Sequence, residues 1–191
     1  NTFRFRFFTL FSMPTAWLAG LRVVQLDDNI CITSLPGGWR SQNPFKTMYW
    51  AVQGMGAELS TGAAPFATSK SMSNKVRMFV VGTEAKFTKR AKGKILFTCK
   101  DNSIARNAIE ESMATGKSVD CELKSVGTDK TGHVVSEWIF KWNFLVIDGI
   151  EKYQYFNPPF YAQFDRLCKL RVNSGKPYML FSNGTHHDIV V

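Results

Sequence analysis

The chain has 191 residues, of which 24 are Lys or Arg and 15 are Asp or Glu, so its net charge is +9. Hydrophobic residues make up 45% and charged residues 20%, which is enough apolar surface for one folded core and excludes a disordered protein. No uncharged apolar run reaches the length of a membrane span, so we expect no spanning helix, and the positive charge allows nucleic acid, a phospholipid surface or a phosphorylated cofactor as partner.

The N-terminal segment combines two arginines, Arg4 and Arg6, with an apolar stretch at 7–11 and small residues at 16–20. A signal peptide has this order of features, but Pro14 interrupts the apolar stretch early. We therefore predict an amphipathic helix, a turn at Pro14 and a second short helix. These helices can lie on the core or on a membrane surface, and packing on the core is our preferred interpretation.

Hydrophobic periodicity predicts alternating groups of strands and helices along the rest of the chain. In chain order these elements are strands at 21–26 and 30–35, a helix at 47–61, strands at 76–85 and 95–99, a helix at 102–115, and strands at 119–124 and 134–146. Thr47 is the predicted N-cap of the long helix, which we expect to end near Gly62. Trp138 and Trp142 share one face of the last strand, where core packing or a dimer contact is the default.

The connections favour one domain of the α+β class. Tight turns join the strands in pairs, which indicates antiparallel pairing. One long helix between two groups of strands predicts a curled antiparallel sheet wrapped around a central helix. We assign residues 1–148 to this domain, including the N-terminal helical segment, and residues 149–191 to a C-terminal extension whose pattern predicts no definite structure.

Cysteine and histidine spacing argues against a metal site. The cysteines at 31, 99, 121 and 168 have no two- or three-residue spacing, so neither a zinc knuckle nor a redox motif is predicted. Buried thiols in a reducing compartment are the expected state, and we predict a cytoplasmic protein. His186 and His187 would point to opposite faces of a strand and lack a third ligand, so we predict neither a metal nor a cofactor.

A single carboxylate stands out on the long helix. Between positions 47 and 69, Glu58 is the one charged residue, and small residues such as Ala51 and Gly54 share its face. A lone carboxylate in such surroundings costs several kcal/mol unless it is paired or hydrated. It therefore either has a buried partner or lines a cleft in which its pKa suits chemistry, and the residue pattern leaves both interpretations open.

The start of this helix offers complementary groups. The amide of Asn43 and the free backbone N–H groups around Tyr49 to Ala51 can hold a carbonyl oxygen as charge develops on it. The helix rises about 1.5 Å per residue, so Glu58 cannot reach the same spot in one chain. A second subunit could bring its own helix start opposite Glu58.

These residues resemble the hotdog-fold thioesterase superfamily. Its pattern places Asn, then Gly three positions later, then His-Gly-Gly after three more, and Asp or Glu nine after the His. The same spacing holds here for Asn43, Lys46, Tyr49 and Glu58, with Trp50-Ala51 after the tyrosine. The stretches at 42–49, 57–62 and 85–93 are similar to a poorly characterised branch, a domain of unknown function, and the likeness covers roughly residues 3–147.

The resemblance implies a homodimer or a dimer of dimers, with sites at the subunit interface for the thioester of coenzyme A or of an acyl carrier. Glu58 would be the general base or nucleophile, and Asn43 would position the thioester or water. Backbone at Trp50 and Ala51 would supply the oxyanion contact, and Tyr49 and Lys46 would line the substrate site. This chain departs from the pattern where it has Lys46 for Gly and Tyr49, Trp50 and Ala51 for His-Gly-Gly.

A basic segment follows the strand after the helix, with five cations at positions 86, 89, 90, 92 and 94. Lys89 and Arg90 can seat the phosphates of a nucleotide-bearing thiol, although a solvated basic turn fits equally well. We predict no nucleic-acid partner, because the cluster is a single turn and Phe87 suits a core strand better than a stacking platform.

The predicted function is hydrolysis of an acyl thioester by a carboxylate. The alternative on the same fold is a non-catalytic acyl-ligand binding protein in which Glu58 is structural, and a basic nucleic-acid-binding module is the third hypothesis.

Overall fold

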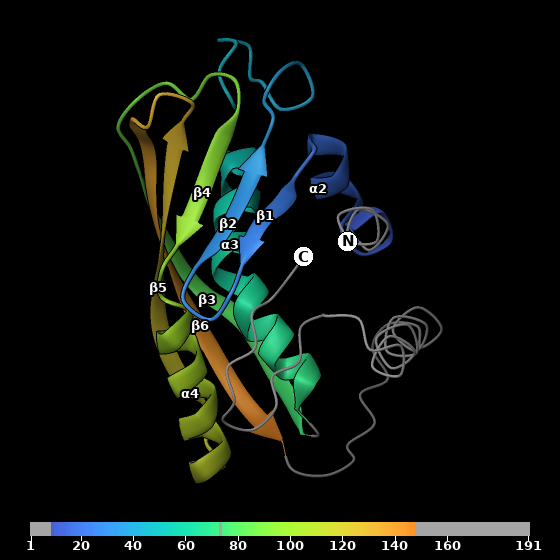
Figure 1. The fold of residues 1–191 in the computed structure, drawn as a ribbon, viewed down its shortest axis with the longest axis vertical. Coiled ribbons are helices and arrows are strands. Elements are labelled where there is room, and N and C mark those ends of the chain that lie inside the picture. Colours follow the sequence, from blue (N-terminus) through green and yellow to red (C-terminus); the bar gives the residue numbers. More distant parts are fainter. Residues whose placement is uncertain (1–8, 73, 148–191) are drawn as a thin grey trace.

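The computed structural model describes residues 9–72 and 74–147, which form a six-stranded antiparallel sheet and three labelled helices (Figure 1). In chain order the elements are α2 (Pro14–Ala19), β1 (Arg22–Leu26), β2 (Cys31–Leu35), α3 (Trp50–Ser71), β3 (Lys75–Phe87), β4 (Ile95–Cys99), α4 (Asn102–Thr115), β5 (Val119–Asp129) and β6 (Val134–Ile147). The strand order across the sheet is β1-β2-β4-β5-β6-β3. The predicted α+β class is confirmed, whereas the predicted extension, with His186 and His187, lies outside the described residues.

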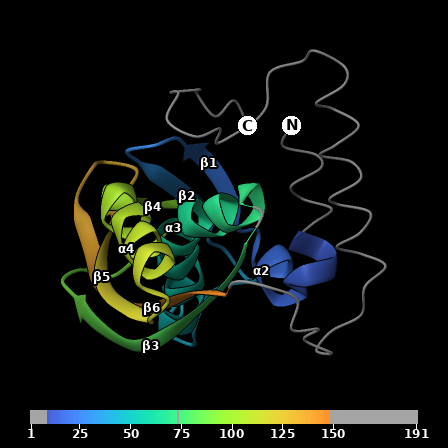
Figure 2. The same ribbon diagram turned by 90° about the horizontal axis from the view of Figure 1, so that it is seen from below.

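The sheet curls around α3, as Figure 2 shows. On β6 the side chains of Trp138, Phe140, Trp142 and Phe144 are buried toward the helix and alternate with exposed or half-buried residues. This alternation places an aromatic layer between α3 and the longest strand, because successive side chains of a strand point to opposite faces. The predicted central helix and the predicted inner face of the last strand are therefore confirmed.

The long helix approaches the sheet closely at its small residues. A Cβ atom at Gly56 would lie 2.6 Å from Cδ2 of Phe97, closer than real contacts allow. The hydroxyl of Thr33 donates a hydrogen bond to the Gly56 carbonyl oxygen at 2.7 Å, and Ser60 Oγ lies 2.7 Å from Ser125 Oγ. The neutral polar residues of α3 are thus bonded into the core, which explains how a helix with so few charges is buried without unsatisfied hydroxyls.

The predicted N-cap of this helix is wrong by two residues. Thr47 does not cap α3, because its N–H and its hydroxyl both donate to Oδ1 of Asn43. The N-cap is Tyr49, whose carbonyl oxygen accepts hydrogen bonds from the N–H groups of Val52 and Gln53. The side-chain carbonyl of Asn43 therefore holds Thr47 in the loop, although the sequence pattern favours Thr47 as the cap.

The predicted end of the helix is also wrong, because α3 continues through Gly62 and Pro65 to Ser71. Tertiary packing overrides the local signal: a Cβ atom at Gly62 would lie 3.0 Å from the Trp142 ring, and Pro65 is fully buried. Here glycine permits close contact with an indole instead of ending the helix.

The structure also tests the predictions for the second short helix and for the cysteines. Ala16, Ala19 and Leu21 belong to the core, so the preferred packing of the second short helix on the core is confirmed. Cys31 and Cys99 are buried free thiols, and burial raises the pKa of Cys99 to about 11. No helix in residues 9–72 and 74–147 is both long enough and apolar enough to cross a bilayer.

Two of the three glycines of α3, Gly56 and Gly54, make the closeness of helix and sheet testable. We expect Gly56→Ala to lower the free energy of unfolding by about 1–2 kcal/mol, because the clash with Phe97 outweighs the gain in helix propensity. Gly54→Ala is the matched control: its Cβ would lie 3.5 Å from Trp138, an ordinary contact, so stability should stay equal or rise. Urea unfolding measures both, and equal effects would contradict the packing described.

Candidate functional site

Glu58 is an exposed residue on the part of α3 that lies over β6, near one edge of the sheet. Gly54 precedes it by one turn and Gly62 follows by one turn, and these glycines contact the rings of Trp138 and Trp142 respectively. Residues four apart share a helix face, so Glu58 stands between the two indoles, beside β6 and next to the edge of the sheet at β3.

The Glu58 carboxylate has no hydrogen-bond or ion-pair partner among the described residues, and its side chain is exposed in the single chain. The backbone of Glu58 is bonded within the helix, where its carbonyl oxygen also accepts a hydrogen bond from the Thr61 hydroxyl at 2.9 Å. Partial burial by neighbouring atoms raises the pKa of the carboxyl above its usual range. The internal ion pair that the sequence left open is not formed within the described chain.

Asn43 organises the loop before α3. Its Oδ1 accepts hydrogen bonds from the N–H of Phe45 at 3.0 Å, the N–H of Thr47 at 3.2 Å and the Thr47 hydroxyl at 3.1 Å. The side-chain oxygen is therefore committed to the loop, whereas its amide nitrogen makes no hydrogen bond within the described chain. That nitrogen is the part of Asn43 that could reach a bound carbonyl or water.

Lys46 has a φ of 56° and is the one non-glycine residue with positive φ in the described chain. The backbone carbonyl of Asn43 accepts its N–H at 2.9 Å, which closes the turn. Left-handed backbone favours glycine, because a Cβ atom crowds the neighbouring carbonyl. The glycine that the thioesterase pattern has at this position therefore has a conformational reason, and Lys46 meets the same geometry with some strain.

The first turn of α3 presents two free donors. No hydrogen bond among the described residues uses the backbone N–H of Trp50 or Ala51, whereas Tyr49 N–H donates to Ser41 at 2.7 Å. The rings of Tyr49 and Trp50 meet edge to face, 5.8 Å apart, and both are exposed. Free N–H groups at a helix start favour an oxygen that gains negative charge.

The basic segment lies beside this helix start, because Met48 N–H donates to the Ala91 carbonyl oxygen at 2.8 Å. Lys89 is not free there: its Nζ lies 3.0 Å from Oδ2 of Asp129 in the β5–β6 turn. Hydrogen bonds from Thr131 and Lys89 hold the pKa of Asp129 well below its usual range. Arg90 is exposed, and no ion pair among the described residues includes it.

The predicted site residues thus form two groups. Asn43, Lys46, Tyr49, Trp50 and Ala51 surround the start of α3, with the basic segment next to them. The second group is Glu58 alone, eight residues after Trp50 and about 12 Å farther along the helix. One chain does not bring the carboxylate to the free N–H groups.

The predicted core packing of Trp138 and Trp142 is confirmed, but the sequence does not predict that they lie beside the turns of α3 before and after Glu58. Trp142 Nε1 donates to Thr61 Oγ1 at 3.0 Å, and Trp138 Nε1 donates to Ser136 Oγ at 3.0 Å, so both indoles are fixed. Gln53 is also buried, and its Oε1 has no partner among the described residues. Because α3 has so few charged residues, the sequence could have suggested that Gln53 is buried. No sequence pattern predicts which tryptophan of a strand contacts which turn of a helix.

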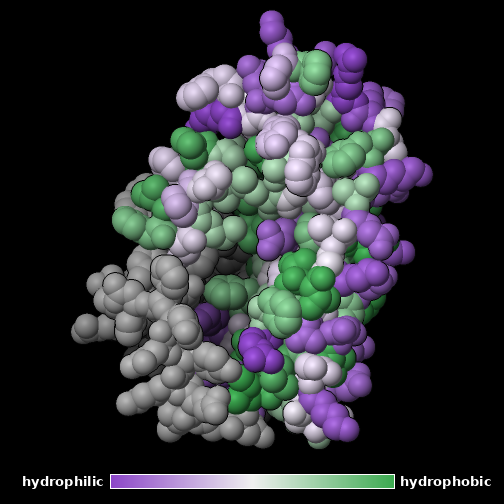
Figure 3. Space-filling view, turned by 180° about the vertical axis from the view of Figure 1, so that it is seen from behind, coloured by the Kyte–Doolittle hydropathy of each residue, from purple (hydrophilic) through white to green (hydrophobic). Residues whose placement is uncertain are grey.

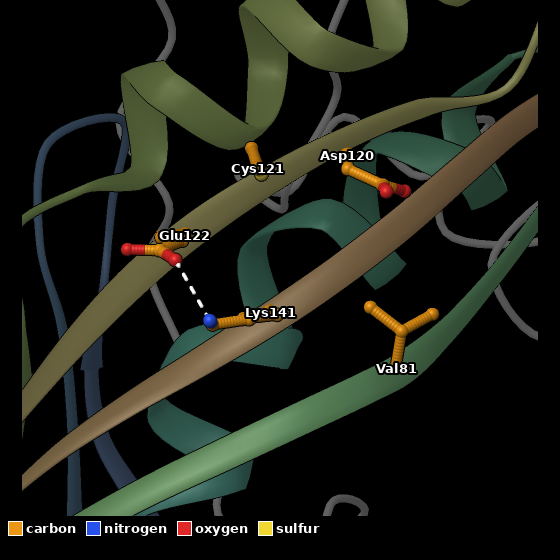
Figure 4. Close-up of a pocket in the computed structure, with 5 residues that line it drawn as sticks. All are labelled: Val81, Asp120, Cys121, Glu122 and Lys141. Carbon is orange, nitrogen blue, oxygen red and sulfur yellow. Dashed lines mark ion pairs between the residues drawn. The ribbon is translucent and has the colours of Figure 1, made fainter.

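A separate, shallow depression of about 360 Å³ lies over β3, β5 and β6 and contains none of the predicted site residues (Figure 4). Its lining residues are Val81, Asp120, Cys121, Glu122 and Lys141. Lys141 Nζ lies 3.4 Å from a carboxylate oxygen of Glu122 and 3.4 Å from one of Glu84. These exposed ion pairs join three strands, and their cation already has two carboxylate partners.

Comparisons with known proteins agree on the architecture. A family model described as a domain of unknown function (DUF4442) matches residues 2–144. A Pseudomonas aeruginosa protein of unknown function, described as a probable thioesterase, is similar with a TM-score of 0.63 and 23% identity over 74% of this chain and 93% of that chain. No curated protein matches the sequence.

Two further solved structures are thioesterases by name. One, from Haemophilus influenzae, has a TM-score of 0.53 and 10% identity over 76% of this chain and 91% of that chain. The other, a mutant thioesterase from Pseudomonas aeruginosa, has a TM-score of 0.56 and 13% identity over 75% of this chain and 94% of that chain. Identities this low establish a shared fold and no shared activity.

The backbone of Lys46 gives a direct test of the loop. We expect Lys46→Gly to raise the free energy of unfolding by about 0.5–1 kcal/mol, because glycine adopts a φ of 56° without strain. Lys46→Val should lower it by about 1–2 kcal/mol, since a β-branched side chain fits this region worst. Lys92→Gly, at an exposed position without positive φ, should lower it slightly; a gain there as well would contradict the explanation.

Proposed function

The chain belongs to the DUF4442 family and has the hotdog fold, and from this premise we propose that it hydrolyses acyl thioesters with Glu58 as general base or nucleophile. The observation that carries the proposal is the unpaired Glu58 carboxylate with a raised pKa, on a helix whose first turn has free N–H donors. A base is most effective when its pKa lies near the working pH, so the direction of this shift suits catalysis.

Two routes are open to this carboxylate. As a base, Glu58 takes a proton from water, the water oxygen attacks the thioester carbonyl, and collapse of the tetrahedral intermediate expels the thiolate. As a nucleophile, Glu58 attacks the carbonyl itself, expels the thiolate and leaves an anhydride that water then hydrolyses. In both routes the N–H groups of Trp50 and Ala51 stabilise the oxyanion, with the Asn43 amide beside them.

The distance between Glu58 and the helix start within one chain supports a homodimer, or a dimer of dimers. Strand β3 is an edge of the sheet, and its residues from Thr83 to Phe87 are exposed on both faces. Pairing of two β3 edges joins the sheets of two chains and brings a second α3 toward Glu58. Each site would then combine Glu58 of one chain with Trp50 and Ala51 of the other.

The proposed substrate is the thioester of coenzyme A or of an acyl carrier. Lys46 and Tyr49 flank the helix start and can contact the pantetheine arm. Arg90 can bind a phosphate, and Lys89 can do so if it exchanges or shares its Asp129 partner. Lys89 therefore suits a phosphate less well than the sequence suggested.

Glu58→Gln tests the chemistry. We expect the variant to lower kcat/KM for a panel of acyl-CoA thioesters by about 10²–10⁴-fold, because the amide can neither accept a proton nor attack a carbonyl. Glu110→Gln, which changes an exposed carboxylate on α4 away from the β3 edge, should leave kcat/KM unchanged. If wild type and Glu58→Gln are equally inert yet both bind acyl ligands, the chain is an acyl-ligand binding protein and the hydrolase proposal is wrong.

The raised pKa of Glu58 also predicts two pH effects. The base must be ionised, so kcat/KM should rise with pH through a pKa above that of an ordinary glutamate.

A carboxyl whose pKa is higher in the folded chain binds protons more tightly there, so unfolding becomes easier as pH rises through this window. Glu58→Gln should therefore be slightly more stable than wild type at neutral pH, as urea titrations at acidic and neutral pH would measure.

Val81 tests the dimer because it is the central residue of β3 and is exposed. In a symmetric antiparallel pair of β3 strands, Val81 of each chain lies near its own copy, so Val81→Glu sets two like charges together. We expect the variant to shift light-scattering mass toward the monomer and to lose hydrolysis in parallel. Val24→Glu, at an exposed position of the opposite edge strand, should change neither; an active monomeric Val81 variant would refute the shared site.

A further inference from the structure

Three loops meet at one end of the molecule, at the top of Figure 1: residues 36–49, 88–94 and 129–133. Met48 N–H bonds to Ala91, and a Cβ atom at Gly37 would lie 2.4 Å from the Gly93 carbonyl oxygen, so the first two loops touch. The ion pair between Lys89 and Asp129 joins the third. We call this surface the basic end.

The basic end carries seven exposed cations and one carboxylate. The cations are Arg40, Lys46, Lys89, Arg90, Lys92, Lys94 and Lys130. The carboxylate is Asp129, which is occupied by Lys89 and by its own turn. Figure 3 shows this end from behind, with hydrophilic side chains around scattered hydrophobic ones. A surface with this balance attracts a dense array of anions.

Two large aromatic side chains stand out among these cations: Trp39 and Phe45 are each 80% exposed. Their loops are ordered by the backbone. Gly37 and Gly38, which precede Trp39, have φ values of 77° and 86°, and the N–H of Phe45 donates to Asn43 Oδ1. The fold therefore holds both rings in water at the tips of tight turns. Exposure of a large aromatic ring is unfavourable unless the ring contacts another apolar surface.

We propose that the basic end docks on the surface of an anionic phospholipid bilayer. Trp39 and Phe45 enter the headgroup region, where aromatic rings are favoured, and the surrounding cations face the lipid phosphates. The inference does not rest on the proposed hydrolysis, because neither aromatic ring belongs to the candidate site. The two proposals share the cations Lys46, Lys89 and Arg90, so the charge reversal in the test of docking uses Lys92 and Lys94, which lie outside the candidate site.

A bilayer fits this surface better than single-stranded nucleic acid, the other partner that combines phosphate with flat rings. Binding of a strand uses aromatic platforms along a basic groove, on which successive bases stack. Trp39 and Phe45 instead lie on separate turns and form no ring pair with each other among the described residues. Phe87, at the end of β3, is half exposed, but its ring is held edge to face against Trp138 at 5.4 Å and is the single aromatic side chain of the basic segment, so it offers no row of platforms for successive bases.

Vesicle co-sedimentation of the full chain tests the proposal. Wild type should bind vesicles of phosphatidylcholine with added phosphatidylserine, bind phosphatidylcholine alone at least about tenfold more weakly, and lose binding in high salt. Trp39→Ser with Phe45→Ser, and separately Lys92→Glu with Lys94→Glu, should each lower the partition coefficient at least about tenfold. The matched control is Met113→Ser with Lys117→Glu on exposed positions at the far end of α4, which should bind like wild type.

Several results would overturn the proposal: no binding to anionic vesicles, equal binding to neutral ones, or equal losses in the α4 control. Retention on single-stranded DNA without vesicle binding would assign the basic end to nucleic acid instead. Thermal unfolding of each variant identifies a loss that comes from misfolding. Since acyl-CoA hydrolysis is measured without vesicles, failure of docking and failure of the hydrolase proposal are distinguishable.

Discussion

The close approach of α3 to the sheet governs the arrangement of the whole domain. With no side chain at Gly56, the helix backbone settles against Phe97 and takes the hydrogen bond from Thr33. This contact fixes the distance of α3 from the sheet and its rotation about its own axis. The rotation in turn determines which helix residues, Glu58 among them, face solvent. The glycines one turn before and one turn after Glu58 contact two indoles that are themselves hydrogen-bonded, so the stretch of helix that carries the exposed carboxylate is fixed against β6.

The sequence reveals the parts of this fold that repeat regularly. From Glu137 to Ile147, strand β6 alternates buried side chains with half-buried or exposed ones, and its four large aromatic residues recur at every second position, so its inner face can be predicted from period alone. The isolated charge of Glu58 is equally visible. The ends of α3 cannot be predicted in this way, because they depend on particular contacts. Thr47 donates its hydrogen bonds to Asn43 and so does not cap the helix, and Gly62 packs against Trp142 and so does not end it.

For the candidate site the sequence predicts residues and not a geometry. Spacing selects Asn43 and Glu58 as candidates, but it cannot tell that the Asn43 oxygen is used within its own loop or that Lys89 is paired with Asp129. The meeting of three loops at one end is also invisible in the sequence, because their cations and rings are separated by up to ninety residues. It leaves the start of α3 beside a surface with seven exposed cations and one carboxylate.

The irregular centre of β3 has a consequence for aggregation. Pairing with β6 shifts register between Val80 and Gly82, so one extra residue bends an otherwise long and partly apolar border strand. A straight foreign strand could match only half of such a border before the hydrogen-bond ladder failed. The bulge therefore disfavours the edge-to-edge stacking of straight strands from which fibrils grow. A second copy of β3, which has the same bulge, can still pair with it.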